Sequence, residues 1–560
     1  MVSRPWYAVV VAASLLGACS KKDRNTCEYW VDKLAQGEQV QEGIRRAGEL
    51  QCVSALPALA AFYEKGETQQ DVFDATVRIG DHEGALPLLR MALKSNDHSK
   101  DAAHIIGDWK LKSAKPELVA LLTDDQYVTL REPVLDALLK IEEPKNVEDV
   151  LIHVAGTDIN AQSYLVNKTA IEKLAELKST KATPTLIKMA FARSMKGQEV
   201  FRWVRRALAE IGDPSLVDQL FAVMAGKNDA VKAQVKAAGF DDWEWQTGPK
   251  VVQLLTDTLD PRVVEPMAQN LAADLKKPVN ATPLQEERWS VHQKNRLKFI
   301  MFALSHIGSE VPIETLSVVL GDRYKDTLNQ RMNAANALAF IGSEAAQDRL
   351  IDAFRRDQSE HFKAALLQII ALGIDDRKLP LWDLMIEEKP FPGEKPTPKP
   401  RRPPGAPPEE IPSAAVKAVL EGNETLKTYL AVQKACGADL GCHLDKVRLG
   451  TRDEKVKALV NLARGRMGAT EDIRHAIFDA FKNAERGDVD TRRFALIALT
   501  RLGDAKDGEK LLELSRAMPE PPPPGVRPPT PDPDKPEEAP PDIYYKDEIW
   551  VIGHAMARRK

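Results

Sequence analysis

The residues that come closest to a reactive cluster lie in the run Cys436-Gly437-Ala438-Asp439-Leu440-Gly441-Cys442-His443. A c-type haem attachment site also ends in Cys-His, but it has two residues between its cysteines, and this run has five. A zinc site takes four ligands, and three candidates stand together here. The two glycines give the backbone the freedom that a tight loop needs. The run therefore predicts a local disulfide between Cys436 and Cys442, with a metal site and a haem attachment as the alternatives.

The other residues that could do chemistry are dispersed along the chain. The sequence contains no His-Glu-x-x-His pair, no Gly-x-Ser-x-Gly elbow and no phosphate-binding loop. Four aspartates stand in turns of the repeated pattern, and we interpret them as helix caps rather than as a catalytic carboxylate ladder. These aspartates are Asp81, Asp108, Asp213 and Asp504. We therefore expect no catalytic residue, no metal site and no cofactor, and we expect that the protein is not an enzyme.

Charge is abundant but balanced along the chain. The sequence holds 78 lysines and arginines against 82 aspartates and glutamates, which gives a net charge of −4. A general nucleic-acid binder needs a basic excess to release phosphate counterions. The composition therefore predicts that nucleic acid is not a partner.

The amino-terminal segment has the pattern of an export signal. Arg4 precedes an apolar run from Tyr7 to Leu15, which is too short to cross a bilayer as a helix. The run ends in Leu16-Gly17-Ala18-Cys19, which resembles the lipobox of bacterial lipoprotein signal peptides. The resemblance implies that residues 1–18 are removed and that the Cys19 thiol and the new amino terminus carry fatty acyl chains, such as palmitate. The alternative is ordinary secretion, in which Cys19 is incidental.

Two further features follow from this resemblance. Residues 19–27 would form a lipidated tether that holds the protein on a membrane surface, because several acyl chains give stable anchoring. In the sorting pattern of the family, Ser20 in place of an aspartate implies the outer membrane of the bacterial cell envelope. The periplasmic or surface face is left open.

The remaining cysteines are even in number. Of the five cysteines, four remain when Cys19 is set aside, and an even number in an exported chain suggests disulfides. Proximity in the sequence favours the pairs Cys27–Cys52 and Cys436–Cys442 among the three possible connectivities. The alternative is that they are free buried thiols.

A unit of two helices recurs along the chain. In Arg206–Leu220 the residues Ala207, Leu208 and Ile211 share one helical face, Gly212 ends the helix, and Pro214 opens the next helix. Turns of this kind follow Ile79, Ile106, Ile141, Leu177, Ile211, Leu259, Ile307, Ile341 and Leu372. They are separated by 27, 35, 36, 34, 48, 48, 34 and 31 residues. Such a period is typical of a helical solenoid.

The pattern Ala-Leu-x-x-Ile-Gly-Asp-Pro resembles HEAT repeats, in particular the short bacterial repeats related to those of phycobilin lyases. The resemblance covers most of residues 40–516, and it departs from the family at Ile141 and Leu177, where the turn glycine is absent. It implies an all-α fold, an α-solenoid of stacked helix pairs over residues 28–388 and a second helical block over residues 413–518.

Two proline-rich segments interrupt the solenoid. Residues 389–412 contain ten prolines and residues 519–541 contain twelve, which excludes a continuous helix. Either the segments are inert linkers, or Arg401 and Arg402 of the first segment belong to an extended ligand for a protein partner. Residues 542–560 are predicted to be a helix that caps the open end of the stack.

The densest aromatic patch contains Trp243 and Trp245. Tryptophan is a frequent interface anchor, so these residues are candidate contacts for a partner. The alternative is that both rings fill an irregular repeat.

Repeats without a catalytic set favour one function above others. We expect a membrane-anchored, extracytoplasmic scaffold that binds protein partners through its solenoid surface. The first alternative is a small-molecule or cofactor-handling protein, by analogy with repeat-containing lyases, with a pocket near Trp243, Trp245 or the Cys436–His443 run. The second alternative is a purely structural envelope protein.

Overall fold

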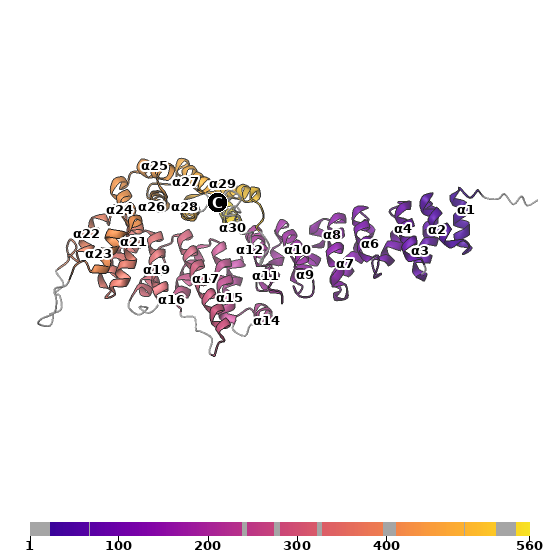
Figure 1. The fold of residues 1–560 in the computed structure, drawn as a ribbon, viewed down its shortest axis with the longest axis horizontal. Coiled ribbons are helices and arrows are strands. Elements are labelled where there is room, and N and C mark those ends of the chain that lie inside the picture. Colours follow the sequence, from indigo (N-terminus) through magenta and orange to yellow (C-terminus); the bar gives the residue numbers. More distant parts are fainter. Residues whose placement is uncertain are drawn as a thin grey trace, which may run out of the picture. The chain divides into compact units, whose positions relative to one another are not determined.

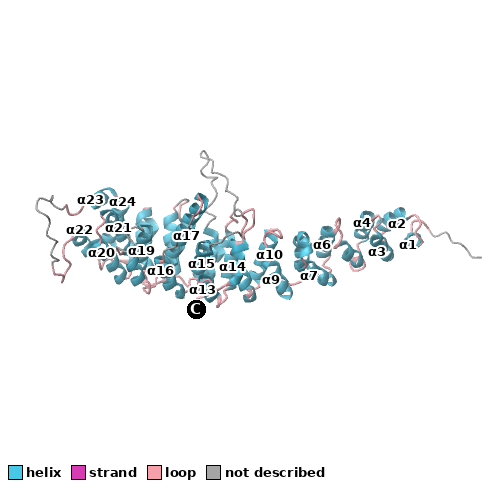
Figure 2. Cartoon of the chain, turned by 90° about the horizontal axis from the view of Figure 1, so that it is seen from below, coloured by secondary structure: helices cyan, strands magenta, loops and turns pink. Residues whose placement is uncertain are grey.

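A computed structural model describes residues 23–66, 68–237, 243–273, 280–321, 328–395, 410–485, 488–521 and 545–559, with residues 243–247 described by their backbone alone. Throughout these ranges the regular elements are helices, and none is a strand (Figure 2). The predicted all-α solenoid is therefore confirmed. None of the helices in the same ranges combines the length and the apolar character needed to cross a membrane.

The repeating unit forms as its sequence predicts, except that its second helix begins two residues after Pro214. Helix α12 (Phe201–Ile211) buries Val204 and Leu208 on one face and ends at Gly212, whose φ of 65° is left-handed. The carboxylate of Asp213 then accepts a hydrogen bond of 2.8 Å from the backbone N–H of Ser215, and α13 (Leu216–Met224) follows. The left-handed turn favours glycine because a side chain is disfavoured there.

One of the four turn aspartates is a helix N-cap, whereas Asp213 stands two residues before Ser215, the N-cap of α13. Asp504 caps α29 (Ala505–Ala517) through the N–H groups of Lys506 and Asp507. Asp108 does not begin a helix. It is the last residue of α6 (Ser99–Asp108), because α6 continues through Gly107, where a Cβ atom would lie 2.9 Å from Cα of Ala137. The N-cap of α5 (Leu86–Ala92) is Ala85 rather than Asp81.

The chain divides into two compact units at Val150. In unit 1 the second helices of each pair contact one another, α2 with α4 and α6 with α8. The elements of unit 1 are α1 (Cys27–Ala35), α2 (Val40–Glu49), η1 (Val53–Ala55), α3 (Leu56–Lys65), α4 (Gln69–Ile79), α5, α6, η2 (Lys112–Ala114), α7 (Lys115–Thr123), η3 (Asp125–Leu130), α8 (Arg131–Ile141) and η4 (Pro144–Val147), and α9 (Glu148–Gly156) crosses the division.

Unit 2 begins with a row of helix pairs, which we call layer 1. Its second helices are α10, α12, α15, α17, α19 and α21, each in contact with the next. Besides α12 and α13, the elements of layer 1 are α10 (Tyr164–Glu176), η5 (Thr180–Ala182), α11 (Thr183–Met189), α14 (Asp229–Ala237), α15 (Trp243–Asp257), η6 (Pro261–Val263), α16 (Val264–Ala272), α17 (Pro283–Ile307), α18 (Ile313–Leu320), α19 (Leu328–Ile341), α20 (Glu344–Arg356), α21 (Glu360–Gly373), η8 (Leu379–Leu381) and α22 (Trp382–Ile386).

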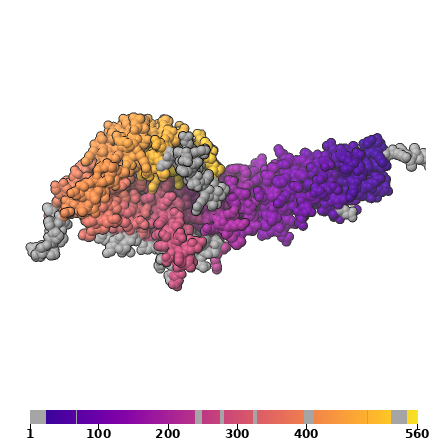
Figure 3. All heavy atoms as spheres, viewed as in Figure 1, coloured from indigo at the N-terminus to yellow at the C-terminus, as the bar shows by residue number. Residues whose placement is uncertain are grey.

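The chain then reverses and returns over layer 1 as layer 2. Helix α24 contacts both α21 and α26, and the row continues so that α26 contacts α21, α28 contacts α17, and α30 contacts α12 and α15. Figures 1 and 3 show the orange and yellow layer 2 lying along layer 1. Besides α29, the helices of layer 2 are α23 (Ala414–Gly422), α24 (Glu424–Cys436), α25 (Leu440–Leu449), α26 (Arg452–Ala463), α27 (Glu471–Asn483), α28 (Val489–Leu502) and α30 (Tyr545–Ala557).

This arrangement differs from the predicted domain boundaries. The compact division falls at Val150, inside the solenoid predicted over 28–388, and the block predicted over 413–518 packs on residues 151–386 in the same unit. The carboxyl-terminal helix predicted over 542–560 is α30. It covers α29, as expected for a cap, but its other side is not open because it packs on α12.

A polar side chain near the start of many second helices caps the first helix of the same pair. The Arg331 guanidinium donates to the carbonyl of Leu320 at the end of α18, with distances of 3.0 and 2.7 Å. Asn167 donates to the carbonyls of Val154 and Ala155 at the end of α9. Both residues stand ten positions before the turn residue of their helix, Ile341 and Leu177. This spacing satisfies helix-end carbonyls that the fold buries.

Two disulfides are present. Cys27–Cys52 joins α1 to the residue that precedes η1, with the two Cα atoms 5.3 Å apart. Cys436–Cys442 joins the last residue of α24 to the first turn of α25, also with Cα atoms 5.3 Å apart. The first disulfide thus links α1 to the segment between α2 and α3.

Candidate functional site

Helix ends of the same polarity meet where layer 2 covers layer 1. Helices α12, α17, α19 and α21 end in this interface, and so do the layer 2 helices α26, α28 and α30. The carboxyl-terminal end of a helix carries a partial negative charge and up to four carbonyls without a helical partner. Two such ends repel unless a cation lies between them. In this protein arginine and lysine side chains of layer 2 supply that cation.

Arg501 of α28 bridges two helix ends of layer 1. Its Nε atom donates to the carbonyl of Ser305 in α17 at 2.7 Å, and its Nη1 atom donates to the carbonyl of Phe340 in α19. The same pattern recurs with Arg464, which donates to the carbonyl of Gly373, and with Arg558, which donates to the carbonyl of Ala209. Each arginine lies at or just beyond the end of its own helix, so one cation serves the ends of both layers.

The arginines can approach this closely because the turn residues beneath them are glycines. Gly212, Gly308 and Gly342 all have left-handed φ angles between 64° and 68°. A Cβ atom on Gly308 would lie 2.7 Å from Nε of Arg501, and one on Gly212 would lie 2.9 Å from Nη1 of Arg558. Each of these glycines therefore permits the left-handed turn after its own helix. Because it has no side chain, it also leaves space for the guanidinium of layer 2.

Lys457 of α26 makes the most enclosed contact of this kind. Its side chain is fully buried, and its Nζ atom donates to the carbonyls of Ala371, Leu372 and Ile374 at the end of α21. Burial lowers the pKa of Lys457 well below its usual value. Burial also lowers the pKa of Arg501 to about 9 and that of Arg464 to about 10, which leaves both guanidinium groups charged at neutral pH.

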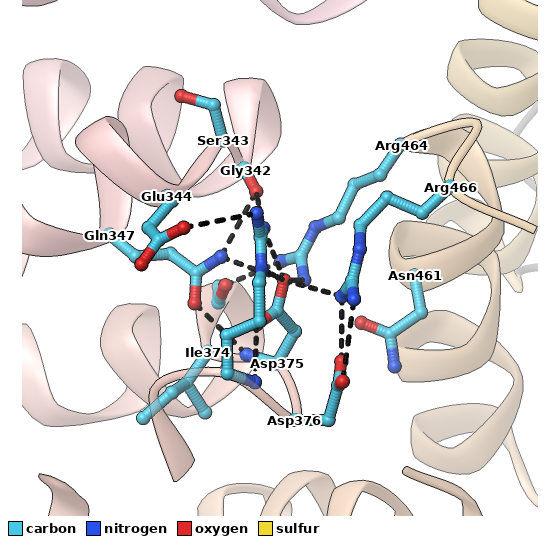
Figure 4. Close-up of polar contacts among 12 residues, drawn as sticks. Gly342, Ser343, Glu344, Gln347, Ile374, Asp375, Asp376, Asn461, Arg464 and Arg466 are labelled. Carbon is cyan, nitrogen blue, oxygen red and sulfur yellow. Dashed lines mark hydrogen bonds and ion pairs between the residues drawn. The ribbon is translucent and has the colours of Figure 1, made fainter. Parts of the chain in front are cut away.

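Asp375 is the buried carboxylate of the interface (Figure 4). It follows α21, and its oxygens accept hydrogen bonds from Gln347 and Arg377 of layer 1 at 2.9 and 2.7 Å. From layer 2, Nη1 of Arg464 and Nη1 of Arg466 approach its Oδ2 atom to 3.3 and 3.1 Å. Burial alone would raise the pKa of Asp375, but the surrounding guanidinium groups hold it at about 2. The carboxylate is therefore ionised whenever the layers are docked.

Opposite charges also pair at the other end of the interface. Asp547 of α30 forms an ion pair with Arg202, whose Nε atom lies 2.9 Å away, and it accepts a hydrogen bond from Nε of Arg206. Both arginines belong to α12. Glu520, which follows α29, pairs with Nη1 of Arg206 at 2.9 Å and with Nζ of Lys546 at 2.6 Å. Layer 2 is thus held by polar contacts at three successive positions along layer 1.

His306 is a neutral member of the same interface. It is fully buried beside Phe302, and its Nδ1 atom forms a 2.8 Å hydrogen bond with Oγ1 of Thr500 in α28. Burial, together with the nearby positive charge of Arg501, lowers the pKa of His306 well below 6.5. The imidazole is therefore uncharged in the folded protein.

The Cys436–His443 run forms a disulfide turn. Gly437 has a φ of 55°, and α25 begins at Leu440, so Cys442 and His443 already belong to a helix. His443 is buried, its Nε2 atom donates to the carbonyl of Gly437 at 3.1 Å, and burial lowers its pKa. Across the described ranges, three or more His, Cys, Asp or Glu side chains nowhere gather as they would around a metal ion.

Several predicted site residues lie where the structure gives no side-chain description. Cys19, Arg401 and Arg402 are outside the described residues, and Trp243 and Trp245 are described by their backbone alone, in the first turn of α15. Their roles stay predictions.

Sequence reasoning missed the cations of the interface. Arg464, Arg501 and Arg558 stand near the ends of helices, where a basic residue is normally explained by the dipole of its own helix. The available signal was the recurrence of such a residue beside the turns of three layer 2 helices. It could not show that a second helix end lies opposite.

Comparison with known proteins supports the repeat assignment. Residues 330–356 match the family model of the PBS lyase HEAT-like repeat, and this segment covers most of α19 together with α20. The match spans α19, its turn and the helix that follows, and it includes Arg331, Gly342 and Gln347 of the contacts above. No curated protein matches the chain.

We predict that Gly308→Ala destabilises the protein more than Gly80→Ala. Both glycines have left-handed φ angles, so either substitution costs about 1–2 kcal/mol of backbone strain. At Gly308 the new Cβ also displaces Arg501. The buried carbonyls that Arg501 contacts then lose their hydrogen-bond donor, which adds about 1–3 kcal/mol to the destabilisation. At Gly80 the nearest atom to a new Cβ is 3.9 Å away. Urea unfolding measures both costs, and equal costs would contradict a fixed position for Arg501.

We predict that acid weakens unit 2 through His306. Since the folded pKa lies below the unfolded value of 6.5, His306 stabilises the fold fully above pH 6.5 and loses this contribution as the pH falls below it. The loss per group is at most about 1.4 kcal/mol per pH unit. His306→Gln should make the free energy of unfolding less dependent on pH between 8 and 5. An unchanged slope in urea titrations at these pH values would show that His306 does not contribute.

Proposed function

We propose that the protein is a lipid-anchored scaffold of the bacterial cell envelope that binds a protein partner through the second helices of unit 1. The fold supports the scaffold part, since HEAT-like stacks present long surfaces of repeated helices. One observation carries the proposal. The face of the second helices that layer 2 covers in unit 2 is accessible to solvent in unit 1.

Equivalent positions illustrate this difference. Arg206 lies five residues before the turn residue Ile211 of α12, and it pairs with Asp547 of layer 2. The residues five positions before Ile79 in α4 and Ile141 in α8 are Asp74 and Asp136. Both reach the solvent, and Asp136 keeps 51% of its side chain exposed. A partner that packs on unit 1 as layer 2 packs on layer 1 would meet these carboxylates.

A groove between α2 and α4 marks the same face. Its volume is about 450 Å³, and it is lined by Gln41, Glu42, Arg45, Asp71, Asp74, Ala75 and Arg78. The lining is polar and carries both signs of charge, which is typical of surfaces that select a partner by electrostatic complementarity. Such a groove suits a charged side chain of a protein better than an apolar small molecule.

The envelope location rests on the amino-terminal sequence and on the cysteines. The Leu16–Cys19 lipobox pattern implies acylation of Cys19, and disulfides such as Cys27–Cys52 persist in oxidising compartments. Anchoring through Cys19 would hold unit 1 within a few residues of the membrane surface, because α1 begins at Cys27. Export, acylation and scaffolding without catalysis together form the proposed function.

We predict that Asp74→Arg reduces partner binding and that Glu64→Arg does not. Both substitutions reverse one accessible carboxylate of unit 1, but Asp74 lines the groove on α4, whereas Glu64 is an exposed residue of α3. Chemical cross-linking in solubilised membranes, followed by mass spectrometry, should recover a stoichiometric partner with the wild-type protein and with Glu64→Arg. We expect about tenfold less with Asp74→Arg, equal to about 1.4 kcal/mol. Recovery of no stoichiometric partner, or equal recovery from both variants, would reject the proposed surface.

We predict that Cys19→Ser abolishes acylation and membrane retention. The hydroxyl of serine cannot form the thioether that the lipobox chemistry requires, so the precursor should keep residues 1–18 and remain unlabelled by radioactive palmitate. Cys436→Ser is the matched control, since it also replaces one cysteine by serine and should retain the label. Labelling of Cys19→Ser would show that the anchor lies elsewhere.

A further inference from the structure

Layer 2 ends one step before layer 1 does. Helix α30 is the last helix of layer 2 and packs on α12, whereas the preceding second helix of layer 1 is α10. The face of α10 is accessible, since Glu172 and Glu176 keep 44% and 56% of their side chains exposed. A step therefore forms where the covered part of layer 1 meets the uncovered part.

A cleft of about 370 Å³ occupies this step. Its walls come from four helices and the residues beyond them, namely α10, α12, α29 and α30. Trp203 of α12 and Trp550 of α30 both line it, together with Ala175 and Ala207. Trp550 is fixed by a 3.4 Å hydrogen bond from its Nε1 atom to the carbonyl of Arg206. The cleft thus offers two indole rings held on rigid elements.

One carboxylate at the cleft forms no direct ion pair, although Lys178 and Arg516 attract it from a longer distance. Glu520 pairs with Arg206 and Lys546, Glu172 pairs with Lys168, and Glu176 pairs with Lys173. Within the described part of unit 2, Glu210 of α12 has no ion-pair partner, although it is half-buried at the cleft. Burial raises the pKa of Glu210, Glu176 adds to this effect, and the positive charges of Lys178 and Arg516 oppose it.

Two cations already lie over the indole rings near this carboxylate. Nζ of Lys168 lies 5.8 Å from the ring of Trp203, and the guanidinium of Arg516 lies 6.0 Å from the ring of Trp550. Both distances are within the range at which a ring face attracts a positive charge. An aromatic wall next to an unpaired carboxylate is complementary to a further cationic side chain.

We propose that this cleft binds an arginine or lysine side chain carried by a helix of a protein partner, which extends layer 2 by one step over α10. The inference rests on the proposed function, since it requires that the chain binds protein. Continuity with the interface supports it. Layer 2 brings Arg464, Arg501 and Arg558 to helix ends of layer 1, and the end of α10 is the next one beyond Arg558. The left-handed residue after α10 is Lys178 rather than glycine, so the cation of a partner would lie in the cleft beside Glu176 and Glu210 and not directly above the turn.

The test measures whether the cleft selects a cation. The probe is a fluorescein-labelled alanine–glutamine helix of about 17 residues, long enough to form a helix in isolation, with one arginine in its last turn. Matched peptides carry lysine, glutamine or glutamate at that position. Fluorescence anisotropy with the full mature chain should show that the arginine and lysine peptides bind about tenfold more tightly than the glutamine peptide, and that the glutamate peptide binds most weakly.

Variants of the chain locate the binding. Glu210→Gln and Glu176→Gln should each weaken the arginine peptide about tenfold and leave the glutamine peptide unchanged. Glu314→Gln, an exposed carboxylate on α18, is the control and should have no effect. Because the raised pKa of Glu210 means that its charge disfavours the folded state at neutral pH, Glu210→Gln should unfold at the same temperature or higher, which excludes misfolding as the cause.

The outcomes separate this inference from the proposed function. Three outcomes would reject binding of a cation in the cleft. They are equal affinity for all four peptides, no binding of any peptide up to about 1 mM, and a loss of binding with Glu314→Gln as great as with Glu210→Gln. If the partner captured through Asp74 is still recovered in that case, the proposed function stands without the cleft. If the arginine peptide binds at Glu210 but no partner depends on Asp74, the cleft is supported as a binding site and the proposed surface of unit 1 is rejected.

Discussion

Unit 2 depends on the meeting of negative helix ends across two layers. A solenoid places the ends of its second helices along one edge, and a solenoid that folds back on itself brings two such edges together. Each helix end carries about half a negative charge and several carbonyls that need donors. Arg501 resolves this conflict for α17 and α19 with one guanidinium, and Lys457 does so for α21 with three hydrogen bonds.

This interaction also fixes the register of the layers. A guanidinium fits above Gly308 because no Cβ is present, and a shift of layer 2 by one helix would place Arg501 over α15, where Leu259 occupies the left-handed position. Buried cations contribute more to such selection than to net stability, since their desolvation offsets much of the attraction. Asp375, ionised between guanidinium groups of both layers, adds a second requirement that a shifted arrangement would not meet.

The sequence predicts the local structure and leaves out the long-range contacts. Periodic apolar residues and the glycine after Ile211 are enough to place α12, its turn and α13, because these features act within one repeat. The proximity of Cys27 to Cys52 likewise indicates their pairing. The reversal of the chain after α21 depends instead on contacts between residues about 90 to 200 positions apart, such as Lys457 with Ala371 and Thr500 with His306. No local pattern encodes which basic residue meets which helix end.

The occupied face of layer 1 indicates what an external partner of this chain would need. The contacts of layer 2 do not require that it belongs to the same chain. Layer 2 supplies helices, arginines at their ends and carboxylates for Arg202 and Arg206. A separate protein that also carries arginines at its helix ends could dock on unit 1 by the same physics, and it would meet carboxylates such as Asp74 in place of Arg206. The charge at this position is positive in α12, at Arg206, and negative in α4, at Asp74, which affects which helices can dock. It would prevent layer 2 itself from docking on unit 1, because Asp547 would face Asp74, and it would reserve that face for a partner of opposite charge.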